Sequence, residues 1–265
     1  MKSKLSSEFM YQVVALFLAV IIVHAIYVGV VRPNADAILE QQLALQAAGE
    51  NFVPSRSLYV ILKDYEQESC FILMFWAMAI MGFKARQSLR ESRLLDQQLI
   101  QVSEGMNILP EDAREYLRPI QALPTEQREF LLARLLLTAL QRFSSTRNIQ
   151  NVSSSIKEIC ENESDRLDSE LSMIRYIAWA IPSIGFIGTV RGIGEALGQA
   201  HLAVEGDIAG VTASLGVAFN STFVALVISI IIMFLLHQVQ LLQERLVLDN
   251  QKYCDNNLMR YLQVR

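Results

Sequence analysis

The sequence predicts an all-α membrane protein with four transmembrane helices and long cytoplasmic helical extensions. Of its 265 residues, 52% are hydrophobic and 19% are charged, whereas roughly 25% of the residues in a typical soluble domain are charged. The mean hydropathy is positive, at +0.29. The apolar residues are also concentrated in four segments, and a membrane-spanning helix needs about 20 such residues. Clustering of this kind favours a membrane protein over a soluble one.

The first two predicted spans lie near the N-terminus. Residues 9–31 are an uncharged run that is longer than the apolar core of a signal peptide, so we expect a helix that is retained in the membrane. Residues 69–83 form a shorter uncharged run between Glu68 and Lys84. A short span is accommodated by local thinning of the bilayer.

The last two predicted spans are 174–198 and 208–237. Arg191 and Glu195 interrupt the third span near its end. The fourth belongs to a longer uncharged stretch, 208–243, which exceeds what one crossing requires. We therefore expect this helix to project beyond the membrane.

Basic residues predict the orientation, because Lys and Arg are enriched on the cytoplasmic side. Lys2 and Lys4 precede the first span, and Lys84 and Arg86 follow the second. Both termini are then cytoplasmic. The predicted segments are a cytoplasmic N-terminus 1–8, spans 9–31 and 69–83 around an external segment 32–68, a cytoplasmic helical insert 84–173, spans 174–198 and 208–237 around an external turn 199–207, and a cytoplasmic helical tail 238–265.

One helix of the insert resembles a span in its composition. The stretch that begins at Phe130 is rich in leucine, but it carries Arg134 and Arg142 and follows Arg128. Charged residues at this density are costly in a membrane. We expect this helix to pack inside a cytoplasmic helical bundle.

Small and hydroxyl-bearing residues form one stripe on each of the last two spans, at spacings that keep them on one helix face. The stripes are Ala178, Pro182, Gly185, Thr189, Gly192 and Ala196 on the third span, and Ser214, Ala218, Thr222, Ala225 and Ser229 on the fourth, with Asn220 and Ser221 beside the latter. One interpretation is close helix packing, which small residues allow. The other is that the two stripes line a pathway or seat another helix. Pro182 frees a backbone carbonyl and favours a kink or an ion path.

These residues resemble the MotA/TolQ/ExbB family of proton-channel subunits. The third span contains Pro182-x-x-Gly185-x-x-Gly188-Thr189-Val-x-Gly192, and the fourth contains Leu215-Gly-Val-Ala-Phe-Asn-Ser-Thr222-Phe-Val-Ala-Leu226. The resemblance covers roughly residues 170–260. Two patterns in this order, on adjacent spans joined by a short turn, are more specific than either pattern alone.

The resemblance implies an assembly and a route for ions. It implies a homopentamer around a dimer of a single-span partner of the MotB/TolR/ExbD type, which supplies the ion-binding carboxylate. Thr189 and Thr222 would then line the ion route, and Pro182 would be the proline of the family. The expected pathway residues are Thr189, Thr222, Pro182, Gly185, Ser221, Asn220 and Ala218.

The distribution of acids is consistent with a carboxylate from another chain. The middle of each predicted span lacks Asp and Glu, although a proton relay normally needs an ionisable group within the membrane. The threonines suit H⁺ and Na⁺ alike. His24, in the first span, is interpreted as a packed or interfacial residue rather than a proton carrier.

Arg191 departs from the family pattern, which has an apolar or aromatic residue there. Arg191 and Glu195 are one helical turn apart and are expected to pair. The pair is either structural, or it forms a charge at the pore mouth that tunes ion access or contacts the partner.

Other classes of function lack support in the sequence. We find no nucleophile with a neighbouring base, no phosphate-binding loop, no metal-ligand spacing and no basic stretch for nucleic acid, so neither an enzyme nor a bound cofactor is expected. The alternative function is a non-transporting membrane scaffold whose cytoplasmic helices recruit a partner. In that case the two stripes serve packing alone.

Overall fold

The structure is a computed structural model that describes residues 2–47, 57–100, 102 and 106–264. Within this part of the chain all regular elements are helices, and the β pairing is an isolated bridge between Ile108 and Leu262. Four helical stretches among the described residues are long and apolar enough to cross a membrane: Glu8–Gln42, Tyr65–Ser92, Ile149–Gly198 and Ala209–Tyr261. The predicted class, an all-α protein with four spanning helices, is confirmed.

The chain divides into two compact units, which are described separately. The first consists of Met1–Met81 and Met173–Leu236, and the second of Gly82–Ser172 and His237–Arg265. The first unit contains most of the apolar helical surface. The second contains the predicted cytoplasmic insert and the C-terminal tail.

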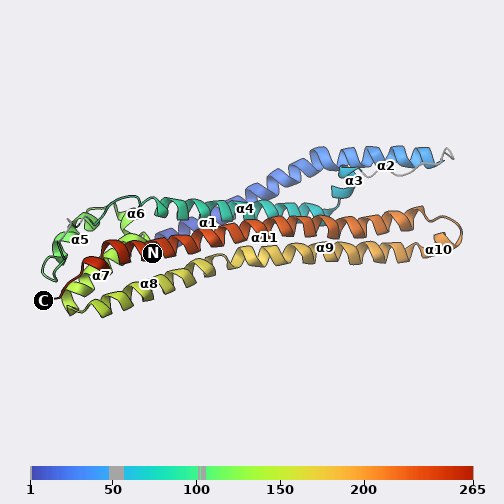
Figure 1. The fold of residues 1–265 in the computed structure, drawn as a ribbon. Helices are drawn as coiled ribbons and strands as arrows, with labels where there is room; N and C mark the ends of the chain where they lie inside the picture. Colours follow the sequence, from blue (N-terminus) through green and yellow to red (C-terminus); the bar gives the residue numbers. More distant parts are fainter. Residues whose placement is uncertain (1, 48–56, 101, 103–105, 265) are drawn as a thin grey trace. The chain divides into compact units, whose positions relative to one another are not determined.

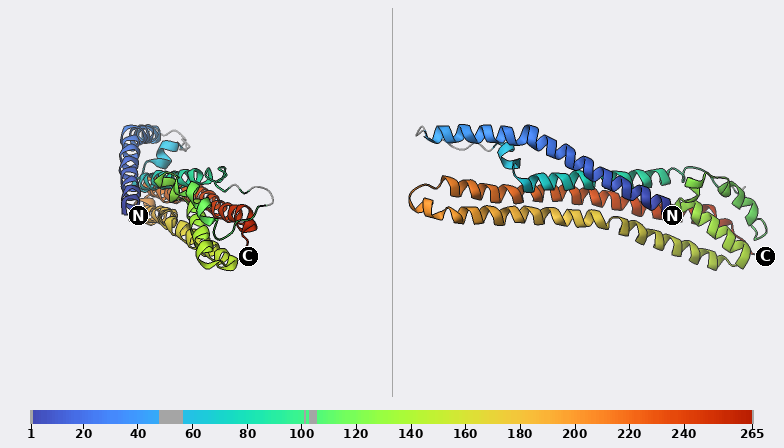
Figure 2. Two further views of the ribbon diagram at one scale, coloured as in Figure 1. Left: turned by 90° about the vertical axis from the view of Figure 1, so that its left-hand side faces the viewer. Right: turned by 180° about the vertical axis from the view of Figure 1, so that it is seen from behind.

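A continuous helical rod opens the first unit. It consists of α1 (Lys2–Ile26), the π-helix η1 (Tyr27–Val31) and α2 (Arg32–Ala47), without an intervening loop. Figures 1 and 2 show the direction of the rod changing between α1 and α2. A π-helical turn is an established cause of such a bend. The helix therefore does not end at residue 31 but continues into the segment predicted to be external.

The next elements are α3 (Leu58–Leu62) and α4 (Tyr65–Ser92). α4 begins about one turn before the predicted span, because its first turn includes Glu66 and Glu68. Acidic side chains are favourable at a helix N-terminus, where the helix dipole is positive. α4 packs on α1, and Trp76 Nε1 donates a hydrogen bond to the carbonyl oxygen of Gln12 at 2.9 Å.

The third and fourth helices of the first unit lie side by side (Figure 1). They are α9 (Ser172–Gly198) and the first part of α11 (Ala209–Asn257), and the short helix α10 (Ala200–Val204) connects them. The region predicted as an external turn, 199–207, thus holds one helical turn of its own.

The second unit is a helical bundle. It contains α5 (Ala113–Gln121), α6 (Thr125–Arg128), α7 (Leu131–Thr146), α8 (Ile149–Glu170), the 3₁₀ turn η2 (Met259–Tyr261) and the last part of α11. α7 supplies much of the core, with Leu135, Leu140 and Phe143 fully buried. The leucine-rich helix after Phe130 is therefore part of a bundle, as predicted from its arginines. One of them, Arg134, bonds to Glu163 at 3.0 Å.

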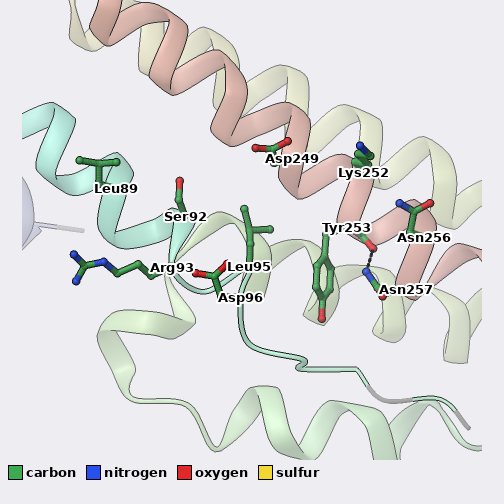
Figure 3. A pocket seen from close by; sticks show the side chains of 10 residues that line it. All are labelled: Leu89, Ser92, Arg93, Leu95, Asp96, Asp249, Lys252, Tyr253, Asn256 and Asn257. Carbon is green, nitrogen blue, oxygen red and sulfur yellow. Dashed lines mark hydrogen bonds between the residues drawn. The ribbon is translucent and has the colours of Figure 1, made fainter.

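An open groove in the second unit lies between the end of α4 and the last turns of α11 (Figure 3). Its lining residues are Leu89, Ser92, Arg93, Leu95, Asp96, Asp249, Lys252, Tyr253, Asn256 and Asn257. Basic and acidic side chains are mixed along it, so the groove has no clear preference for a cationic or an anionic ligand. The functional site is better sought in the first unit.

Candidate functional site

The two small-residue stripes face each other and form the contact between α9 and α11, which we call the seam. A Cβ atom added at Gly192 would lie 2.7 Å from the backbone nitrogen of Ala218 and 2.7 Å from the carbonyl oxygen of Ser214. One added at Gly188 would lie 2.5 Å from Cβ of Ser221. All three distances are shorter than side chains tolerate, so glycine is needed at both positions for this approach of the helices. The interpretation as close packing is therefore correct for most of both stripes.

Gly192→Ala is expected to destabilise the protein by about 1–3 kcal/mol, because the backbone of α11 must shift to admit the methyl group. Gly194→Ala is the matched control, because an added Cβ at Gly194 has no neighbour within 4 Å. Alanine is a better helix former than glycine by up to about 1 kcal/mol, so this control should be neutral or stabilising. Thermal unfolding of the two purified variants provides the comparison, and equal stability would contradict the packing described here.

The hydroxyl groups of Thr189 and Thr222, which we call the threonine pair, meet within the seam. The two Oγ1 atoms are hydrogen-bonded to each other. Thr189 Oγ1 also lies 3.0 Å from the carbonyl oxygen of Ala218, and Thr222 Oγ1 lies 3.0 Å from that of Gly185. Each hydroxyl group has one proton, so two of these three contacts are hydrogen bonds at any one time. Two hydroxyl oxygens and two carbonyl oxygens thus gather at one point between the helices.

The threonine pair lies at the edge of the seam and is only half-buried. Phe186 and Val190 on α9, and Phe219 and Phe223 on α11, lie one helical turn or less from the pair and are each more than half exposed. The hydroxyl groups therefore lie beside an apolar surface that the described residues of this chain leave uncovered.

Pro182 has a structural partner across the seam. A proline in a helix cannot donate to the carbonyl four residues earlier, which here belongs to Ala178. Ser229 Oγ donates to that carbonyl at 3.1 Å. The carbonyl freed by the proline thus accepts a hydrogen bond from α11 instead of one from its own helix.

The other predicted pathway residues divide between two sides of α11. Ala218 and Gly185 join the threonine pair through their carbonyl oxygens. Ser221 is buried on the side that faces α4, where its Oγ accepts a hydrogen bond from Gln67 Nε2 at 3.4 Å. Asn220 is half-buried, and within the described residues no hydrogen bond joins it to the threonine pair.

Arg191 forms the expected bond with Glu195, and it also has a closer partner that the sequence did not indicate. Arg191 Nη1 lies 3.0 Å from Glu195 Oε1. Its Nε and Nη2 atoms lie 2.7 and 2.9 Å from the two carboxylate oxygens of Glu66, the bidentate geometry that arginine favours. Arg191 therefore connects α9 to the first turn of α4.

Acidic side chains of α4 lie closer to the seam than the sequence suggested. Glu66 Cγ lies 3.2 Å from the position of a Cβ on Gly188, near the middle of the third predicted span. The uncharged run that predicts the second span begins after Glu68, so these acids lie outside the predicted span. The alternation Asp64-x-Glu66-x-Glu68 at the start of an apolar helix was the available signal, because acids favour the first turn.

Glu68 is buried among basic partners from the first rod. Its carboxylate is hydrogen-bonded to Arg32 and lies 2.7 Å from His24 Nδ1. The Arg32 guanidinium also lies over the rings of Tyr65 and Tyr27, at 4.3 and 5.7 Å from their centroids. His24 is thus a polar partner in the first unit rather than only a packed residue.

The site offers neutral oxygen ligands rather than a titratable group at its centre. The hydroxyl and carbonyl oxygens around the threonine pair have lone pairs. These can coordinate a cation, bind water or accept a hydrogen bond from a protonated group. Within the described residues no acidic or basic side chain is bonded to the pair.

A comparison with known protein families gives a match that covers the seam. Residues 127–252 match the model of the MotA/TolQ/ExbB proton channel family. The matched region includes α9, α10 and most of α11, and it confirms the resemblance identified from Pro182, Thr189 and Thr222. No curated protein and no solved structure matches the chain. Residues 127–252 are therefore similar to proton-channel subunits, and the four long apolar helices indicate a membrane protein.

Proposed function

We propose that this chain is the ion-conducting subunit of an energy-transducing motor, with a ring of five copies surrounding a single-span partner in a bacterial inner membrane. The partner, of the MotB/TolR/ExbD type, carries the aspartate that binds the ion. The transported ion is the proton, with Na⁺ as the alternative. The chain catalyses no covalent chemistry and binds no cofactor in this proposal.

The observation that carries the proposal is the threonine pair at the exposed edge of the seam. Its four oxygens lie beside an apolar surface formed in part by Phe186 and Phe223. A single apolar helix could pack on that surface and bring a carboxyl group to the hydroxyls. Hydrophobic contacts would then hold the partner, and hydrogen bonds from the hydroxyl groups would stabilise the charge of its carboxylate.

The acids of α4 do not replace the carboxylate of the partner. Glu66 and Glu68 are bonded to Arg191 and Arg32, respectively. Glu66 also lies on the Ser221 side of α11, because its Cγ and Ser221 both lie beside Gly188. Both carboxylates therefore already have a guanidinium partner within this chain.

The proposed mechanism converts proton flow into movement of the ring around the partner. A proton from the external side neutralises the aspartate of the partner beside one threonine pair. The neutral carboxyl group moves through the apolar surface more readily than a carboxylate, because burial disfavours charge. Release to the cytoplasm restores the charge at the next subunit. Each proton supplies about 2.3 kcal/mol per 100 mV of membrane potential.

Native mass spectrometry of the complex purified from membranes tests the assembly. We expect five copies of this chain with two copies of a protein that has one span and an aspartate in that span. A monomeric chain, or a complex in which the partner lacks a membrane acid, would contradict the proposal. It would favour the scaffold alternative, in which the seam serves packing alone.

A further inference from the structure

The first turn of α4 and the residue before it, Asp64–Glu68, form what we call the acidic turn. It holds three acids with unequal partners. Glu66 is bonded by both oxygens to Arg191, and Glu68 is bonded to Arg32 and His24. Asp64 has a weaker interaction, because Arg191 Nη2 lies 3.7 Å from its Oδ1. Of the three, Asp64 is the carboxyl group whose charge is least compensated.

One oxygen of Asp64 is buried without a hydrogen-bond partner. This atom, Oδ2, is one of four such side-chain atoms among the described residues, and two others are Gln67 Oε1 and Tyr27 OH. Native proteins rarely leave buried polar atoms unsatisfied, so a group of them calls for an explanation, such as a bound ion or proton. Here three of the four belong to the acidic turn or to the rod that packs against it.

Gln67 lies at the same corner of the fold as Asp64. Its side chain is fully buried. Its Nε2 donates a hydrogen bond to the carbonyl oxygen of Ile61 at 3.0 Å, so the amide group lies against α3. Its unpartnered Oε1 can only accept a hydrogen bond. An ionised Asp64 can also only accept. Protonation would change Asp64 into a donor and so allow a buried acceptor to be satisfied.

We infer that Asp64 is a proton-binding residue on the external side of this chain. The Oδ2 carboxylate oxygen takes up one proton from hydronium and releases water, and the group becomes a neutral carboxylic acid. Gln67 Nε2 donates a hydrogen bond to Ser221 Oγ, so the acidic turn also contacts α11. The inference rests on the proposed function, to which it adds a site of proton uptake.

The charges around Asp64 agree with this role. Lys63 adjoins it, Arg191, Glu66 and Glu195 face it from α9 and α4, and Tyr27 faces it from η1. Burial raises the pKa of the Asp64 carboxyl above its ordinary value, although the positive charges of Lys63 and Arg191 act in the opposite direction. The protonated form is therefore more favourable in the folded protein than in the unfolded chain.

The raised pKa of Asp64 determines how the stability of the protein changes with pH. A group whose pKa is raised on folding stabilises the protein most when it is protonated, and this contribution is lost as the pH rises through its folded pKa. Asp64→Asn resembles the protonated form at every pH. The variant should therefore unfold at a higher temperature than the wild type at neutral pH, and the difference should shrink in acid.

Infrared spectroscopy of the purified full-length protein in lipid tests the site, without a partner or ion flux. Lowering the pH should produce a carbonyl band from a protonated carboxylic acid. The band should shift when all aspartates carry ¹³C, should be absent in Asp64→Asn, and should persist in the matched control Glu195→Gln, which alters another acid bonded to Arg191.

Two results would overturn the inference. One is the same titrating band in the wild type and in Asp64→Asn. The other is a band in the wild type that does not shift when the aspartates carry ¹³C, because the remaining acids of the cluster are glutamates. This second result does not depend on the folding of the variant. A titrating Asp64 in a complex that conducts no protons would instead contradict the proposed function and leave the site intact.

Discussion

We expect Thr222→Val to assemble like the wild type and to lose proton flux by roughly ten- to hundredfold, because hydrogen bonds to charged groups contribute about 1.5–3 kcal/mol. Valine has nearly the shape of threonine but no hydroxyl group. The variant loses the bonds to Thr189 and to the carbonyl oxygen of Gly185. The seam should remain closed, since its glycines are unchanged.

Thr212→Val is the matched control for this loss. Thr212 lies on the same helix, and its hydroxyl group bonds to carbonyl oxygens of its own helix, those of Ile208 and Ala209. The change of side chain is identical, but it lies away from the threonine pair. Proton flux that falls equally in both variants, or that survives in Thr222→Val, would show that the pair is not on the ion route.

The second large effect is expected at Arg32. Arg32→Gln should destabilise the protein by about 3 kcal/mol, because breaking a buried ion pair leaves a charge without compensation. The Arg32 and Glu68 side chains are 21% and 8% exposed, so solvent can replace little of the lost interaction. The variant also loses the stacking of the guanidinium on the ring of Tyr65.

A double variant separates the loss of the pair from the loss of packing. In Arg32→Gln with Glu68→Gln, neither position carries a charge, so the cost of an uncompensated carboxylate disappears. Thermal unfolding should show the double variant to be more stable than the single one. If the double variant is less stable, or if Arg32→Gln unfolds like the wild type, the ion pair does not hold the rod to α4.

The sequence was sufficient to predict the seam because its signal is periodic. Residues spaced at helical intervals share a face whatever surrounds the helix, and Thr189 and Thr222 followed directly from that spacing. The mutual hydrogen bond did not follow, because the antiparallel register of α9 and α11 depends on the turn that connects them. The occupation of the Ala178 carbonyl by Ser229 depends on the same register.

The acidic turn was missed for a physical reason. A run of uncharged residues predicts a membrane span, but such a run excludes acids that lie inside the helix when basic residues from other helices compensate them. Glu66 and Glu68 are paired with residues more than 30 positions away in the sequence, Arg191 and Arg32. Periodicity within one helix contains no information about such partners.

The π-helix η1 was also beyond the reach of the sequence. Tyr27–Val31 is apolar and continuous with the helices on both sides, and its composition does not distinguish a π-helical turn from an α-helical one. Its effect is visible only in three dimensions. The turn precedes Arg32 directly and brings Tyr27 into the core formed with Phe71 and Leu62.

The central claim is that this chain provides half of a proton path and that another chain provides the titrating carboxylate. Its most direct test is proton uptake into liposomes under an imposed membrane potential. We expect uptake when this chain is reconstituted with its single-span partner, and none when the membrane aspartate of the partner is changed to asparagine. Equal uptake by this chain alone, or by the complex without that aspartate, would contradict the account.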